Sequence, residues 1–108
     1  MNWEKATGIA FEIGKSKLEE RRVELFRKAA EYARIRVEWQ LSPPEGRLRM
    51  DERRRLVHNE FIAACEAMSS NMQAEGEDIS WKTELGTDRK EIGDFACYLN
   101  LILGLVAR

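Results

Sequence analysis

A chain of 108 residues, of which 44% are hydrophobic and 34% charged, is long enough to bury a core without disulfides or metal ions. We therefore expect a single domain over residues 1–108. The net charge of −1 argues against a protein that binds nucleic acid over its whole surface. Charge is nevertheless unevenly distributed, with a net of +4 over residues 1–58, −6 over residues 59–88 and +1 over residues 89–108. Such a dipolar chain fits head-to-tail contacts between subunits.

Residues 3–41 have the apolar spacing of an amphipathic helix. The large apolar residues that recur at seven-residue intervals are Phe11, Leu18, Leu25, Tyr32 and Trp39. Gly8 and Gly14 weaken the first third, because a glycine inside a helix costs about 1 kcal/mol relative to alanine. Residues 3–13 are therefore expected to form either a separate short helix or a segment that bends at Gly14.

The run Ser42-Pro43-Pro44-Glu45 ends this helix, because the residue before a proline is pushed out of helical geometry. The same run can begin the next helix, with Ser42 as N-cap, Pro43 at the first helical position and Glu45 completing a capping box. Asp51 is an alternative start. The second helix is expected to continue to about Ala74. Its predicted apolar stripe is Val57, Phe61, Ala64, Cys65, Met68 and Met72, with Leu48 and Met50 as possible extensions.

Residues 75–87 are expected to be the main loop, with one helical turn over residues 80–85. Asp88 is the predicted N-cap of a last helix that continues to about Val106. Its predicted core stripe is Ile92, Phe95, Ala96, Leu99, Ile102, Leu103 and Val106. The chain lacks the period-two alternation of strands, so we expect an all-α fold: an up-down-up bundle of three main helices, with an extra N-terminal helix if residues 3–13 separate.

The last helix carries a second apolar strip, formed by Cys97, Leu101 and Leu105. Three helices bury only one side of such a helix. Either residues 3–13 cover the strip, or it is simply exposed, or it is a subunit interface. The last reading is favoured, and it makes the protein a non-enzymatic, self-associating protein-protein interaction module that forms a homodimer.

Five of the twelve arginines fall within nine residues: Arg47, Arg49, Arg53, Arg54 and Arg55. They can form a solvated face partly neutralised by Asp51 and Glu52, or pair with acidic residues 75–78. The alternative is a site for phosphate, nucleic acid or an acidic protein. A helix-turn-helix over residues 80–85 and 88–106 is disfavoured, because its second helix is too apolar for recognition.

His58 is the single histidine and is expected to hydrogen-bond a neighbouring helix. The alternative is a ligand or enzyme site in the bundle near His58. The sequence has no paired His, paired Cys or Glu-x-x-His, so neither a metal nor another cofactor is expected. Glu91 and Asp94 are expected to stabilise the N-terminus of the last helix, where negative charge is favourable. The alternative is a catalytic carboxylate pair with Glu60 or Glu66. Asp94 can also pair with an arginine of another helix.

Cys65 and Cys97 are isolated and fall on apolar helix faces, which indicates free thiols rather than a disulfide framework. The N-terminal residues lack the basic and apolar regions of a signal peptide. The apolar run 95–107 is shorter than the roughly 20 residues that a bilayer requires. We therefore expect a cytoplasmic protein without a membrane contact.

Several short segments near the C-terminus share a pattern: Ser80-Trp81, Leu85-Gly86, Asp88-Arg89-Lys90 and the run from Ile92 to Cys97. They resemble the C-terminal segment of a family of small uncharacterised bacterial helical proteins. The resemblance covers about 30 residues of this sequence. It implies a stand-alone bacterial helical protein, and it carries no catalytic residues over to this chain.

Overall fold

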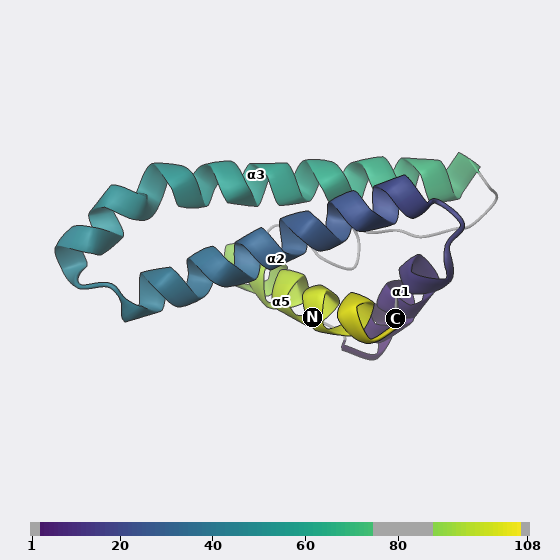
Figure 1. The fold of residues 1–108 in the computed structure, drawn as a ribbon, viewed down its shortest axis with the longest axis horizontal. Coiled ribbons are helices and arrows are strands. Elements are labelled where there is room, and N and C mark those ends of the chain that lie inside the picture. Colours follow the sequence, from purple (N-terminus) through teal and green to yellow (C-terminus); the bar gives the residue numbers. More distant parts are fainter. Residues whose placement is uncertain (1–2, 75–87, 107–108) are drawn as a thin grey trace.

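The computed structural model describes residues 3–74 and 88–106, and every element in these ranges is an α-helix (Figure 1). The helices are α1 (Trp3–Lys15), α2 (Glu19–Leu41), α3 (Pro44–Ala74) and α5 (Arg89–Val106). The all-α prediction is confirmed. The described residues form four helices, which are the three main helices expected and the additional N-terminal one. No helix in the described part of the chain is both long enough and apolar enough to cross a membrane.

The N-terminal segment is a separate helix, α1, which ends beyond Gly14 at Lys15. The break follows at Ser16, whose hydroxyl accepts a hydrogen bond from the backbone N–H of Leu18 at 3.0 Å. Because the helix is interrupted here, the seven-residue series does not continue into α1. Phe11, predicted to belong to the apolar stripe, is 42% exposed, and Ala10 and Ile13 are buried instead.

The corner between α2 and α3 is built differently from the prediction. Ser42 has extended backbone geometry, and its hydroxyl donates to the carbonyl oxygen of Glu38 at 2.6 Å. It thus satisfies an orphan carbonyl at the end of α2 and does not serve as the N-cap of α3. Pro44 takes the first helical position that was assigned to Pro43. The alternative start at Asp51 is wrong, because α3 is already continuous there.

Helix α2 lies between α3 and α5 and runs antiparallel to both (Figure 1). The start of α5 lies beside the end of α2, because Gly93 contacts Arg36, whereas Gly104 near the other end of α5 contacts Phe26. Helix α5 therefore runs in the same direction as α3, and not in the up-down-up order expected. Arg89 returns to the level of His58, about 24 Å back along α3 from Ala74 at 1.5 Å per residue. The 14 residues between the two helices are long enough to reach that point.

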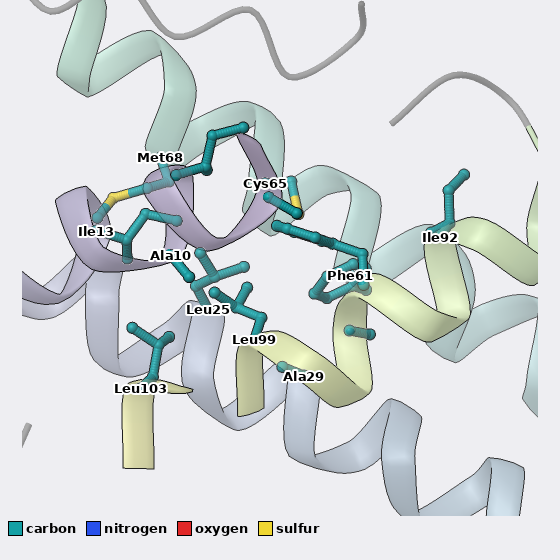
Figure 2. Close-up of a cluster of buried hydrophobic side chains, with 14 of the residues drawn as sticks. Ala10, Ile13, Leu25, Ala29, Phe61, Cys65, Met68, Ile92, Leu99 and Leu103 are labelled. Atoms are coloured by element: carbon teal, nitrogen blue, oxygen red, sulfur yellow. The ribbon is translucent and has the colours of Figure 1, made fainter. Parts of the chain in front are cut away.

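One apolar core joins all four helices (Figure 2). Helix α1 contributes its buried face at Ala10 and Ile13, and packs mainly on α5. The fully buried large side chains are Ile13, Leu25, Phe61, Met68, Met72, Phe95, Leu99 and Leu103. The predicted stripes of α3 and α5 are thus largely confirmed. Leu48 is wrong as an extension, since it is 73% exposed.

Helix α5 begins as predicted. The carboxylate oxygen Oδ1 of Asp88 accepts a hydrogen bond from the backbone N–H of Lys90 at 2.8 Å, so Asp88 is its N-cap. The expected loop over residues 75–87 and its helical turn over residues 80–85 lie outside the described residues.

Candidate anion-binding site

A cavity of about 550 Å³ opens between the second half of α2, the first half of α3 and the start of α5. Pockets that bind small molecules typically measure roughly 300–1,000 Å³, so this one is large enough for a ligand. The residues that line it are Tyr32, Ile35, Arg36, Trp39, Gln40, Asp51, Arg54, Arg55, His58, Arg89, Lys90 and Gly93.

The lining is strongly basic. Five cationic side chains face one carboxylate, that of Asp51, and the cations come from three helices: Arg36, Arg54, Arg55, Arg89 and Lys90. Within the described residues, no carboxylate forms an ion pair with Arg55, Arg89 or Lys90. Like charges gathered around a concave surface repel one another and raise the local concentration of anions. The cavity is therefore suited to a negatively charged ligand.

Arg36 is held in place by an ion pair between helices. Its Nη1 lies 2.7 Å from Oδ1 of Asp94, which confirms the expectation that Asp94 pairs with an arginine of another helix. The guanidinium passes directly over Gly93, where a Cβ atom would lie 3.1 Å from Nη1. Gly93 is thus explained by the close approach of this side chain.

His58 faces the pocket from α3 and is hydrogen-bonded to α2, as the sequence predicted. Its Nδ1 lies 2.8 Å from the hydroxyl oxygen of Tyr32, and the two rings meet edge to face at 5.8 Å. Burial lowers the pKa of His58 below its usual 6.5, and the positive charge of Arg89 lowers it further. Burial raises the pKa of Tyr32. Neutral His58 with Tyr32 as donor carries its proton on Nε2, where it can donate to a ligand.

Trp39 organises one wall of the cavity. The guanidinium carbons of Arg47 and Arg54 lie 4.3 and 4.4 Å from the centre of its ring. These arginines are two helical turns apart on α3, so the indole ring lies between them. The Nε1 atom of Trp39 is buried and has no hydrogen-bond partner among the described residues. The stacking on the Trp39 ring thus helps to orient the Arg54 side chain at the pocket wall.

The predicted arginine cluster does not act as one surface. Arg47 donates to the carbonyl oxygens of Trp39 and Gln40 at 3.0 and 3.2 Å and so satisfies the end of α2. Arg49 donates to a carbonyl of its own helix at 3.4 Å. Arg53 pairs with Glu38 on α2 at 3.2 Å. Only Arg54 and Arg55 of the five line the cavity.

The partial neutralisation of the cluster is seen at Asp51, which lies 3.7 Å from Arg54. The other suggested partners, the acidic residues 75–78, lie outside the described residues. The suggested carboxylate pair is not formed with Glu60, because Glu60 binds Lys28 of α2 at 2.8 Å. Asp94 is occupied by Arg36.

The second apolar strip of the last helix is divided by the fold. Cys97 is half-buried, and its sulfur lies 3.9 Å from Nη1 of Arg36. Leu101 and Leu105 are 59% and 61% exposed. Helix α1 does not cover them, because it meets α5 at Tyr98, whose hydroxyl lies 2.6 Å from that of Thr7. Cys97 is thus turned toward α2, and the two leucines remain on the surface.

Sequence reasoning singled out His58, Arg54 and Arg55 but missed the rest of the pocket. One signal was present: Tyr32, Arg36 and Gln40 recur at four-residue intervals and so share a face of α2. That face could not be matched to Arg89 and Lys90 without knowing the direction of the last helix.

Comparison with known proteins gives no further guide to this site. No protein-family model, curated protein sequence or solved structure matches the chain. The resemblance of its C-terminal segments to small bacterial proteins therefore receives no support from these comparisons.

Proposed function

We propose that this protein is a non-enzymatic binding protein that takes a small, multiply charged anion, of the phosphate-ester type, into the basic pocket. One observation carries the proposal: five cationic side chains from three helices converge on a cavity of about 550 Å³, and within the described residues only Arg36 and Arg54 of the five are paired with a carboxylate, Asp94 and Asp51. A ligand with two or more negative charges balances this excess. Guanidinium groups suit phosphate oxygens, because they donate two parallel hydrogen bonds.

The lining supports binding rather than covalent chemistry. The described residues of the cavity wall include no serine, threonine or cysteine that could act as a nucleophile. His58 is oriented by the Tyr32 hydroxyl and not by a carboxylate, unlike the histidine of a catalytic triad. An enzyme with its site near His58 remains the alternative, and turnover of a phosphate ester would favour it.

A small ligand is preferred to nucleic acid because Arg55, Arg89 and Lys90, which form no ion pair within the described residues, lie around a concavity. A duplex is usually held by a row of cations along a ridge or helix face. The arginine cluster offers no such row here, since Arg53 is paired with Glu38 and Arg47 is bound to backbone carbonyls. As part of the same proposal we place the protein in the cytoplasm, where the free thiols of Cys65 and Cys97 are stable.

Isothermal titration calorimetry with pyrophosphate, sulfate and a short DNA duplex tests this function. The pocket variant is Arg55→Glu with Arg89→Glu. The matched control is Arg21→Glu with Arg49→Glu, which changes the net charge equally at exposed positions outside the cavity. We expect pyrophosphate to bind the native protein. The pocket variant loses charged hydrogen bonds to pyrophosphate, so its affinity for pyrophosphate should fall at least roughly tenfold. The affinity of the control should fall by no more than about threefold.

Three results would contradict the proposal. The first is the absence of heat with either anion. The second is equal weakening in the pocket variant and its control, which would show diffuse attraction rather than a site. The third is tighter binding of the duplex than of pyrophosphate, which would favour the nucleic-acid function.

A further inference from the structure

An apolar strip is exposed in the described part of the chain where α2 and α5 lie side by side, and we call it the α2–α5 face. It consists of Val23, Phe26, Ala30 and Val37 on α2, with Leu101 and Leu105 on α5. Val23 and Val37 are 57% and 55% exposed, and Phe26 is 37% exposed. The four α2 residues fall within a stripe about 60° wide on the helical wheel. The contact of Phe26 with Gly104 places the exposed turns of α5 next to this stripe.

The spacing of the strip on α2 is self-complementary. Val23 and Val37 lie seven residues before and after Ala30, which is two helical turns or about 10.5 Å on either side. In an antiparallel pair of α2 helices with a two-fold axis beside Ala30, Val23 of each copy therefore lies against the partner's Val37. The symmetry gives two such contacts. Ala30 meets its own copy at the centre, where a small side chain lets two helices approach closely. Two-fold axes of this kind are the commonest symmetry of soluble oligomers.

Two exposed arginines, Arg27 and Arg34, flank the strip on the helical wheel of α2. Arg27, which adjoins the strip, is already paired with Glu24 at 2.5 Å on the same helix. The anion pocket is not involved, because none of the six residues of the α2–α5 face lines it.

We propose that the α2–α5 face is the interface of a homodimer, occupied by a second copy of this chain whose α2 packs antiparallel with Ala30 at the two-fold axis. This inference is independent of the proposed anion binding. It keeps two of the three interface residues expected from the sequence, Leu101 and Leu105, and replaces Cys97 with residues of α2.

Disulfide trapping tests the register. The background is Cys97→Ala, and Cys65 stays in place because it is buried and its burial raises the pKa of the thiol. The Ala30→Cys variant should cross-link to itself under mild oxidation. Val23→Cys should not, because its two copies would lie about 21 Å apart, and a disulfide joins Cα atoms about 4.4–6.8 Å apart. An equal mixture of the Val23→Cys and Val37→Cys variants should cross-link.

Light scattering on the unmodified chain tests the dimer itself. We expect twice the 12.5 kDa mass of one chain at micromolar concentration. Val37→Glu should give the monomer, whereas Leu56→Glu, at an equally exposed position on α3, should leave the dimer intact. A monomeric native protein overturns the inference and leaves the anion pocket untouched. Self-cross-linking of the Val23→Cys variant overturns the antiparallel register, and dissociation by Leu56→Glu overturns the face.

Discussion

Arg36 on α2 crosses over Gly93 on α5 before its guanidinium reaches Asp94. A side chain at position 93 would occupy the space that the guanidinium needs, since a Cβ there would lie 3.1 Å from Nη1 of Arg36 and 3.3 Å from Cε1 of Tyr32. The glycine thus costs α5 some helix stability and gives the pocket a cation fixed at its wall. This exchange can be measured, because Gly8 offers a comparison in open space.

The two glycines should respond differently to alanine. Gly8 lies within α1 with no atom close to the position of a Cβ, so Gly8→Ala should raise the free energy of unfolding by about 0.5–1 kcal/mol. Gly93→Ala should fail to give this gain and should weaken pyrophosphate binding, because Arg36 must shift away from Asp94. Urea unfolding and calorimetry measure the two effects. Equal stabilisation with unchanged binding would show that Arg36 moves freely.

Anion affinity should increase as the pH falls through the range in which His58 titrates. In the free protein, burial and the nearby charge of Arg89 hold the pKa of His58 below 6.5. A bound anion favours the charged imidazole and raises that pKa, so binding takes up a proton. Sulfate is the suitable probe because its charge is constant over this range. Its affinity should rise between pH 7.5 and 5.5 in the native protein, and more weakly in His58→Gln.

The ligand-free protein should show the opposite dependence in its stability. The folded pKa of His58 lies below the unfolded value of about 6.5, so the unfolded state takes up the proton first. The resulting stability is complete above pH 6.5 and is lost as the pH falls toward the folded pKa. Urea unfolding of the native protein and of His58→Gln at pH 7.5, 6.5 and 5.5 isolates this contribution. A difference between the two that stays constant with pH would contradict it.

Trp39 is expected to matter through its ring rather than its N–H group. Trp39→Phe keeps an aromatic surface for Arg47 and Arg54 and removes a buried donor that has no partner in the described residues. Trp39→Leu removes the aromatic surface as well. Trp39→Leu should therefore lose more stability than Trp39→Phe, by roughly 1–2 kcal/mol for two cation–π contacts. The pyrophosphate affinity should follow the same order, because Arg54 loses its support.

Phe61 is the residue on which the core depends most. It is fully buried in the core (Figure 2). Its ring lies 5.6 Å from that of Tyr32 and 6.4 Å from that of Phe95, and it thereby joins three helices. Phe61→Ala should lower the free energy of unfolding by about 3–5 kcal/mol. Leu48→Ala on the same helix should change it by less than about 0.5 kcal/mol, since Leu48 is largely exposed. Chemical denaturation of the two variants provides the comparison.

Local features of the sequence determined the helices and most of the core. The boundaries at Leu41, Pro44 and Asp88 follow from prolines and a capping carboxylate, whose effects reach only a few residues. The stripe of α3 from Phe61 to Met72 follows from periodicity alone. The series of α2 failed where it was continued into α1, because a periodic pattern carries phase information only within one unbroken helix.

The pocket could not be predicted because it depends on how helices are matched. Arg36, Arg55 and Arg89 are far apart in the sequence, and their convergence requires α5 to run antiparallel to α2. A connection as long as the 14 residues that precede α5 permits either direction, so no local signal decides it. Two expectations about this region were confirmed: His58 hydrogen-bonds a neighbouring helix, and Asp94 pairs with an arginine of another helix. Each concerns a single side chain and does not depend on the direction of α5.

The contact between α1 and α5 has a consequence for how the protein is made. Thr7 and Tyr98 are 91 positions apart, yet their hydroxyl groups meet at 2.6 Å. Helix α1 is synthesised before α5, so its apolar side, which includes Ile9 and Ile13, lacks its main packing partner until α5 has left the ribosome. The hairpin of α2 and α3 can form earlier from neighbouring residues. A nascent chain halted before α5 should therefore expose α1 to chaperones and proteases while the hairpin is already protected.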